Sequence, residues 1–341
     1  MNLFKIVGIL VLMALFVPLS VIPSNAKSRS GTLTVSVDLS RYPASEEAEL
    51  WIPYPVSDKD QRITDVKISG NYAASAVYTD RTYGTPMLYA RWEKGTASRA
   101  LKFSFKAERD EVIRRDFPAQ EAAWSPADYA EYLGSSSRGP IDGEVLLLAA
   151  RITAGKKTVL EKARAIYDWT CENTYRDPET RGCGTGDVFN LLAKPGGKCA
   201  DIHSMFVALA RAAGVPAREV FGIRMGKKEK EDVTGGQHCW AEFYLPGYGW
   251  VPVDPADVRK AMLTENLKLE DAKTDEYRAY FWGGIDQYRV KLSVGRDLTL
   301  NPPQPGGPVN YLMYPFARVG DNILDWLDPA AFKYSITFSA N

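Results

Sequence analysis

The sequence predicts an α+β protein in which a helix packs on an antiparallel sheet, preceded by an all-β, sandwich-like domain. Apolar and polar residues alternate with a period of two early in the chain. The pattern changes to helical spacing after the turn-rich stretch at residues 134–143. Beyond it, the order helix, strand, hairpin, strand differs from the alternation of strands and helices in a parallel sheet.

The amino terminus has the features of a secretory signal peptide at residues 1–26. A lysine precedes the apolar run at residues 6–17, and a proline break leads to Ser24-Asn25-Ala26, a small-residue cleavage motif. An uncleaved anchor is the alternative, because residues 3–22 nearly reach the roughly 20 residues that span a bilayer. We therefore expect an exported protein, periplasmic or secreted, with an association with the cell envelope as a further expectation.

The charge of the chain argues against some classes of partner. The 341 residues include 42 basic and 42 acidic side chains, so the formal net charge is zero. A balanced charge gives no field that would attract nucleic acid or anionic lipid. We expect a protein or peptide substrate and no nucleic acid, and the sequence makes no prediction of oligomeric state.

Residues 27–118 are predicted to form the sandwich-like domain. Two segments show the alternation of half-buried strands, with apolar side chains at Leu33, Val35, Val37 and Leu39 and at Leu101, Phe103, Phe105 and Ala107. Short apolar runs at 50–52, 66–68 and 87–92 lie between turn residues. Several short strands separated by turns are typical of an antiparallel sandwich.

Residues 119–270 are predicted to form the α+β core. Thr158 and Glu161 have the spacing of a capping box, which predicts a helix near 158–174. A second helix is expected from Cys199 to Ala213, because Gly214 has the place of a C-terminal cap and a proline follows it.

Three strands follow the second helix. Residues 217–225 and 238–245 are predicted strands, with a charged loop at 226–236 between them, and a turn leads to a third strand at 250–253. Residues 271–341 are expected to add strands and coil packed on this core.

Cys199 is the candidate nucleophile. The N–H groups at a helix amino terminus carry partial positive charge, which lowers the pKa of a thiol placed there. Gly196 and Gly197 precede it and are expected to allow close approach of a substrate carbonyl, whose oxyanion the Cys199 N–H would stabilise. On position alone, a structural role for this cysteine is the stronger interpretation.

His238 and Asp254 change that balance. His238 begins a predicted strand, and Asp254 ends the next one, 16 residues later. Antiparallel neighbours joined by a short turn bring the start of one strand beside the end of the other. Asp254 can then hold one imidazole nitrogen while the other nitrogen faces Cys199.

Two alternative roles for the histidines and cysteines remain open, a second catalytic base and a zinc site. His203, the second of only two histidines, lies four residues after Cys199 on the same helical face, and we favour a structural role for it. A zinc site from Cys199, His203, His238 and Cys239 is disfavoured, because successive strand residues point to opposite faces. We predict no metal and no cofactor.

Export also raises the question of disulfide bonds among the four cysteines. Cys171 and Cys183 are the likeliest pair, since a short polar loop separates them and thiols tend to pair in an oxidising compartment. Two unpaired buried thiols are the alternative.

Three segments resemble the transglutaminase-like superfamily, a variant of the papain-like fold that includes bacterial cysteine peptidases and peptide N-glycanases. They are Gly197-Lys-Cys-Ala-Asp201, His238-Cys-Trp-Ala-Glu-Phe-Tyr244 and Gly249-Trp-Val-Pro-Val-Asp-Pro255, within residues 143–258. The resemblance implies a triad of Cys199, His238 and Asp254 that acts on an amide carbonyl through a thioester. Cys239 and His203 depart from the common pattern of the family, and neither removes a member of the triad.

These observations predict an exported cysteine peptidase or isopeptidase. A protein-glutamine gamma-glutamyltransferase has the same triad and differs in resolving the thioester with an amine. A cell-envelope binding protein without catalysis is the alternative from a different class. The substrate is not predicted, because specificity depends on loops such as 226–236.

Overall fold

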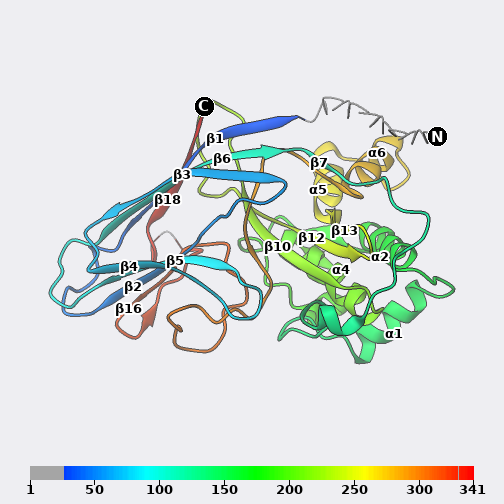
Figure 1. Cartoon of the computed structure of the whole chain (residues 1–341), viewed down its shortest axis with the longest axis horizontal. Coiled ribbons are helices and arrows are strands. Elements are labelled where there is room, and N and C mark those ends of the chain that lie inside the picture. Colours follow the sequence, from blue (N-terminus) through cyan, green and yellow to red (C-terminus); the bar gives the residue numbers. More distant parts are fainter. Residues whose placement is uncertain (1–26, 329) are drawn as a thin grey trace, which may run out of the picture.

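The computed structural model describes residues 27–328 and 330–341, which form two parts that lie side by side (Figure 1). One part consists of two stacked β-sheets, and in the other helices surround a third sheet. This arrangement confirms the predicted α+β class. The predicted signal peptide, residues 1–26, lies outside the described residues. Among the described residues, no helix is both long and apolar enough to cross a bilayer.

The two sheets of the first part are antiparallel throughout. The first contains, in spatial order, β11 (Lys230–Asp232), β18 (Tyr334–Ala340), β1 (Ser28–Asp38), β6 (Ala100–Asp110) and β3 (Gln61–Gly70). The second contains β17 (Asn322–Ile323), β16 (Phe316–Val319), β2 (Ala48–Pro53), β5 (Pro86–Trp92) and β4 (Ala74–Thr79). Every second residue of β1 from Gly31 to Val37 is buried, as the period-two pattern predicts.

The carboxyl-terminal strands differ from their predicted place. We expected residues 271–341 to pack on the α+β core, but β16, β17 and β18 belong to the two sheets of the first part. β18 pairs with β1 along seven residues and buries Ile336 and Phe338 in the core between the sheets. The predicted loop at 226–236 also contains a strand, β11, because β18 offers it a free edge. The domain boundaries themselves stay a prediction.

The second part contains the sheet that carries the candidate site. Its strands, in spatial order, are β13 (Gly249–Val253), β12 (Gln237–Leu245), β10 (Ala217–Arg224) and β15 (Arg289–Val294). Two small pairs accompany it, β7 (Val112–Ile113) with β14 (Gly284–Ile285) and β8 (Tyr175–Arg176) with β9 (Gly196–Gly197). Its helices are α1 (Gly143–Ile152), α2 (Val159–Asn173), α3 (Val188–Ala193), α4 (Cys199–Ala212), α5 (Pro255–Glu265) and α6 (Ala272–Phe281), with a 3₁₀ helix at Pro126–Tyr132.

The predicted ends of the two central helices are confirmed. The Thr158 hydroxyl accepts a hydrogen bond from the Glu161 N–H at 3.1 Å, and the Glu161 carboxylate accepts one from the Thr158 N–H, so α2 begins with a capping box. α4 ends before Gly214, whose φ of 77° is left-handed. α4 is buried along almost its whole length and packs on β12 and β10.

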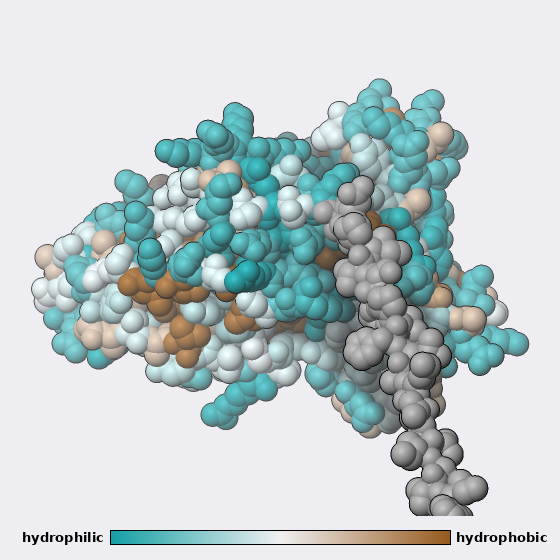
Figure 2. Space-filling model, turned by 45° about the horizontal axis from the view of Figure 1, so that its top comes forward, coloured by the Kyte–Doolittle hydropathy of each residue, from teal (hydrophilic) through white to brown (hydrophobic). Residues whose placement is uncertain are grey.

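One hydrophobic core joins the two parts. Ile223 and Met225, in and after β10, and Val290 and Leu292 of β15 pack in the same cluster as the buried residues of β1 and β6. The surface is mostly hydrophilic in the face that Figure 2 shows, with hydrophobic side chains gathered on the two-sheet part. Because β10 and β15 contribute side chains to this shared cluster, the sheet that carries the site packs directly against the sandwich.

Candidate active site

Cys199 is the first residue of α4 and lies at the wall of a cavity of about 480 Å³. The chain folds back at this point because β9 pairs in parallel with β8 immediately before the helix. Asp201 completes the turn by accepting hydrogen bonds from the N–H groups of Lys198, at 3.0 Å, and Gly186, at 2.8 Å. The structure thus places the thiol at a helix amino terminus, facing a space that a substrate can enter.

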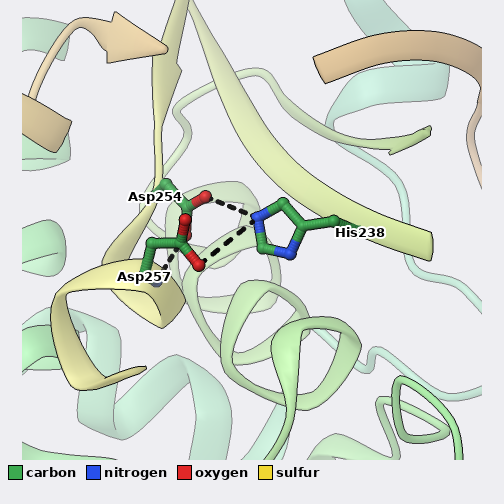
Figure 3. A group of neighbouring side chains, drawn as sticks. All are labelled: His238, Asp254 and Asp257. Atoms are coloured by element: carbon green, nitrogen blue, oxygen red, sulfur yellow. Dashed lines mark hydrogen bonds and ion pairs between the residues drawn. The ribbon is translucent and has the colours of Figure 1, made fainter. Parts of the chain in front are cut away.

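His238 and Asp254 are brought together by the hairpin of β12 and β13. These strands are antiparallel neighbours, and Asp254 directly follows β13 as the N-cap of α5. His238 Nε2 donates a hydrogen bond to Asp254 Oδ2 at 2.8 Å, and the same nitrogen faces Asp257 (Figure 3). Nδ1 is left for Cys199, whose sulfur hydrogen-bonds the His238 side chain. All three predicted site residues therefore meet, and their catalytic role stays a prediction.

The surroundings of Cys199 favour its thiolate. The neighbouring Cys183 and Cys239 thiols, with the hydrogen bond and positive charge of His238, hold the pKa of Cys199 well below its usual value, despite burial. Burial and the interaction with Cys199 raise the pKa values of Cys183 and Cys239 well above the usual value. These opposite shifts favour a thiolate at Cys199 over a thiolate at either neighbour.

The surroundings of His238 favour its imidazolium. Burial and the charge of Arg224 lower its pKa, but the carboxylates of Asp257 and Asp254 outweigh both, so the net shift is upward. A raised pKa at His238 and a lowered pKa at Cys199 together favour an ion pair of thiolate and imidazolium.

A buried ionic cluster behind His238 was not predicted from the sequence. The Arg289 side chain, 1% exposed, binds Asp254, Asp257 at 2.8 Å and Asp286 at 3.0 Å. Arg224 also binds Asp257 and Asp286. Three carboxylates thus face two guanidinium groups, and an imidazolium at His238 balances the remaining negative charge. No sequence signal linked Arg289 to the site, because it lies 35 residues beyond Asp254 in a different strand.

His203 takes a structural position. Its Nε2 lies 3.1 Å from Asp254 Oδ1, and its Nδ1 lies 3.4 Å from the Cys239 sulfur. The residue is fully buried and does not line the cavity. Because both ring nitrogens are engaged away from the cavity, His203 is not placed to exchange a proton with a substrate.

Cys239 and His238 both reach Cys199, although they are neighbours in β12. His238 lines the cavity, whereas Cys239 is fully buried in a cluster with Ala200 and Phe221. The two side chains point to different sides of the strand, as predicted, but each side offers a contact to the same sulfur. The argument made against a zinc site concerned joint coordination of a metal, and the group of possible ligands that the structure brings together, His238, Asp254 and Asp257, does not include Cys239.

The predicted Cys171–Cys183 disulfide is absent from the described residues, where all four cysteines are free and buried. Cys171 packs in the core of the helices, and burial raises its pKa to about 12. Cys183 lies instead in the cluster around Cys199, with its sulfur 3.5 Å from the Gln237 carbonyl oxygen. The two side chains belong to different clusters, so the alternative of unpaired buried thiols is the one observed.

The glycines before Cys199 serve the fold more than the substrate. A Cβ at Gly196 would lie 2.1 Å from the Tyr175 ring, and one at Gly197 would lie 2.3 Å from the Asp201 carboxylate. Neither glycine lines the cavity. The expected role in substrate approach is therefore replaced by a packing role that holds the turn.

Gln237 is a second polar group that sequence reasoning missed. Gln237 is among the residues that line the cavity beside His238, and its Nε2 atom is buried without a hydrogen-bond partner among the described residues. Little in the sequence indicated this, since a glutamine at the start of a strand is ordinary. A buried amide donor without a partner is uncommon in proteins.

His238 and two nearby carboxylates lie close enough together to be considered as ligands of a metal ion. His238, Asp254 and Asp257 offer ligand atoms within 4.8 Å of one another. Both carboxylates already bind Arg289, so guanidinium charge takes the place that a cation would fill. The cysteines of the disfavoured zinc site do not belong to this group.

Comparison with known proteins identifies the family. A model of the transglutaminase-like superfamily matches residues 147–255. An uncharacterized protein of Haemophilus influenzae is 38% identical over 314 residues, which cover 84% of this chain and 85% of that one. The chain belongs to the transglutaminase-like superfamily. A protein-glutamine gamma-glutamyltransferase of Pseudomonas aeruginosa is 30% identical over 112 residues, 31% of this chain and only 16% of that protein.

A solved structure agrees with this transglutaminase-like assignment at the level of the fold. A protein from Cytophaga hutchinsonii, described as a candidate cysteine protease, has a TM-score of 0.54 and 16% identity, covering 92% of this chain and 98% of that one. The superfamily segment contains Cys199, His238 and Asp254. Arg289 lies beyond it, as do the aromatic residues of the cavity wall. The residues that surround Cys199 in this transglutaminase-like protein thus extend beyond the segment that the superfamily model matches.

Proposed function

We propose that this protein is an exported cysteine hydrolase of peptide or isopeptide bonds. The observation that carries the proposal is the Cys199 sulfur at a cavity wall, hydrogen-bonded to His238, whose other nitrogen is held by Asp254. The likeness to a candidate cysteine protease supports the same class of reaction. Export rests on the sequence features of residues 1–26 alone.

The acylation step uses the ion pair directly. The Cys199 thiolate attacks the carbonyl carbon of the amide, and the negative charge moves to the carbonyl oxygen. The Cys199 N–H, at the first position of α4, is the donor placed to stabilise that oxyanion. His238 Nδ1 then gives its proton to the leaving amine as the C–N bond breaks, which leaves a thioester and a neutral imidazole.

The deacylation step reverses these roles. Neutral His238 takes a proton from water at Nδ1, and the hydroxide adds to the thioester carbonyl. The C–S bond breaks, the acid product leaves, and the Cys199 thiolate is restored beside the imidazolium. Asp254 stays ionised throughout: burial raises its pKa, but Arg289, His238 and His203 together hold the pKa well below the usual value.

Alkylation with iodoacetamide at pH 6 tests the nucleophile without knowledge of the substrate. We expect Cys199 to react much faster than a free thiol, because a thiol with the ordinary pKa is almost fully protonated at that pH. The other three cysteines have raised pKa values and serve as internal controls when labelling is located by mass spectrometry.

The variant His238→Ala should slow this alkylation strongly at pH 6 and shift its rise with pH upward. Peptide hydrolysis should fall by about 10²–10⁴. A Cys199 that reacts no faster than a free thiol, with a rate that His238→Ala leaves unchanged, would contradict the proposal and favour a non-catalytic binding protein.

Transfer to an amine is a second candidate, supported by the name of the Pseudomonas aeruginosa relative. The first step is identical, and an amine replaces water in the second. Incubation with exported proteins and a labelled primary amine separates the two functions. Cys199-dependent incorporation of the label supports transfer, whereas release of the acid product without incorporation supports hydrolysis.

A further inference from the structure

The cavity beside Cys199 has two chemically different sides. One side carries Arg176, Lys198 and Lys260, and the other is aromatic, with Tyr314, Trp326, Phe332 and Tyr334 at the end of the chain. Among the described residues that line the cavity, none is an aspartate or a glutamate. The charged side chains at the cavity are therefore all positive, and most of its large apolar side chains are aromatic.

The three cations come from separate elements. Arg176 lies in β8, Lys198 precedes Cys199 as the N-cap of α4, and Lys260 lies in α5. Elements far apart in the sequence thus place positive charge on one concave surface. A single flexible lysine near a cavity is common, because lysine side chains are usually solvated. Here three cationic side chains from three different elements line the cavity of the nucleophile, so their arrangement is set by the fold.

These cations have no carboxylate partner within the described part of the chain. The ion pairs of the structure include Arg224, which also lines the cavity and binds Asp257 and Asp286, but they do not include Arg176, Lys198 or Lys260. Burial and the positive charges of Arg224 and Arg176 lower the pKa of Lys260, and the carboxylates of Asp257 and Asp254, which form no ion pair with it, only partly oppose this shift. The like charges are close enough to repel one another, and a bound anion would relieve that repulsion.

A second observation concerns a polar residue at the same place. Gln237 is about 9% exposed, is among the residues that line the cavity, and has a buried amide Nε2 without a partner among the described residues. The cavity wall therefore contains a residue whose hydrogen-bonding capacity the described residues do not use.

We propose that Arg176, Lys198 and Lys260 bind a carboxylate of the substrate close to the scissile amide, while the aromatic side binds an apolar portion. The preferred substrate is then an acidic peptide. This inference rests on the proposed function, because it assigns a substrate class to the same site. The carboxylate can belong to an acidic side chain or to a peptide carboxyl terminus.

The competition between two alkylating reagents tests this inference without catalysis. Iodoacetate carries a carboxylate and iodoacetamide is neutral, while both react with the thiolate in the same way. We expect the ratio of the iodoacetate rate to the iodoacetamide rate to be several-fold higher for Cys199 than for a free thiol. The ratio should fall as salt is added.

Substitutions identify the charges responsible. Lys198→Gln and Lys260→Gln should each lower the rate ratio by roughly threefold, because each removes one partly exposed charge. Lys156→Gln is the matched control, since Lys156 is exposed in the turn between α1 and α2 and does not line the cavity. A ratio equal to that of a free thiol, or one that Lys198→Gln and Lys260→Gln leave unchanged, would overturn the inference.

A binding measurement separates this inference from the proposed function. Cys199→Ala cannot form a thioester, so its affinity for peptides reports the cavity alone. We compare peptides that carry glutamate or glutamine, and peptides that end in a carboxylate or an amide. Tighter binding of either acid, lost in Lys260→Gln, supports the inference even if Cys199 proves inert. Equal binding of acids and amides overturns it even if Cys199 is catalytic.

Discussion

Asp254 accepts hydrogen bonds from two imidazoles, one backbone N–H and one guanidinium. Its Oδ1 lies 3.1 Å from His203 Nε2 and 2.7 Å from the Asp257 N–H, while its Oδ2 binds His238 and Arg289. A carboxylate has about four acceptor sites, and all four are used here. This saturation fixes the carboxylate, so the His238 ring has one orientation available.

The two histidines should therefore respond differently to removal. His203→Ala should lower the free energy of unfolding by about 2–4 kcal/mol, because it opens a cavity and removes buried hydrogen bonds. Alkylation of Cys199 at pH 6 should stay within about threefold of the wild-type rate. His238→Ala should show the opposite pattern, with slow alkylation and a smaller change in urea unfolding. Slow alkylation in a folded His203→Ala would assign the base to His203.

The buried carboxylates also predict a dependence of stability on pH. Burial raises the pKa of Asp257, but the charges of Arg224, His238 and Arg289 together outweigh it and lower the pKa to about 2 from an ordinary value near 3.8. A group with a depressed pKa contributes stability above its unfolded pKa and loses that contribution as the pH falls through the folded value. We expect the free energy of unfolding to fall between about pH 4 and pH 2.

Urea unfolding at a series of pH values measures this loss. Asp257→Asn should be less stable than wild type at pH 7, because it removes a charge that Arg289 and Arg224 bind. Its stability should depend less steeply on pH between 4 and 2, since one titrating group is gone. Equal slopes in the two proteins would show that Asp257 does not titrate in that range.

At the scale of the element, α4 is a buried core helix whose first residue is the candidate nucleophile. Its first residue is Cys199, and its capping carboxylate, Asp201, fills the space that the absent side chain of Gly197 leaves. The turn before the helix is therefore packed as tightly as the core. The addition of one methyl group at this turn should therefore shift the Cys199 sulfur and change its reactivity.

Gly197→Ala tests this link. Its Cβ would lie 2.3 Å from an Asp201 oxygen, so Asp201 must shift, and we expect a loss of about 1–3 kcal/mol and slower alkylation of Cys199. Gly214→Ala at the other end of α4 is the control. Its φ of 77° costs roughly 1–2 kcal/mol, but no atom lies within 4 Å of the added Cβ. Equal alkylation rates in the two variants would show that strain at the turn does not reach Cys199.

Across the whole molecule, the sandwich supports one wall of the cavity. β18 lies between β1 and β11, and β11 leads into Thr234, Gly235 and Gly236, which line the cavity. Tyr334, the first residue of β18, lines it as well. The position of this wall depends on strand pairing in the other part of the protein.

Phe338→Ala should therefore disturb a site that it does not touch. Phe338 is 1% exposed in the core between the sheets, and its loss should cost about 3–5 kcal/mol. Thr337→Ala is the control on the exposed face of the same strand and should cost less than about 1 kcal/mol. Thermal unfolding and the alkylation rate of Cys199 measure both effects. An unchanged rate in Phe338→Ala would show that the wall is held without β18.

The features predicted correctly from the sequence depend on neighbours close in the chain. The capping box at Thr158 and the glycine cap at Gly214 are set within a few residues. His238 and Asp254 could be paired because one hairpin joins their strands. The contacts of Arg289, Cys183 and β18 link positions far apart, and periodicity carries no information on which distant edges pair. The disulfide prediction was wrong for the same reason, because Cys183 packs with Cys199 and Cys239 and Cys171 packs in a different cluster.

The pairing of β18 with β1 and β11 also ties the site to late parts of the chain. Arg289 and the strand at Tyr334–Ala340 both follow Cys199 in the sequence. Without them, Asp254 lacks its guanidinium partner and β11 lacks its neighbour. The site and its cavity wall are therefore complete only when strands from the whole length of the described chain have paired.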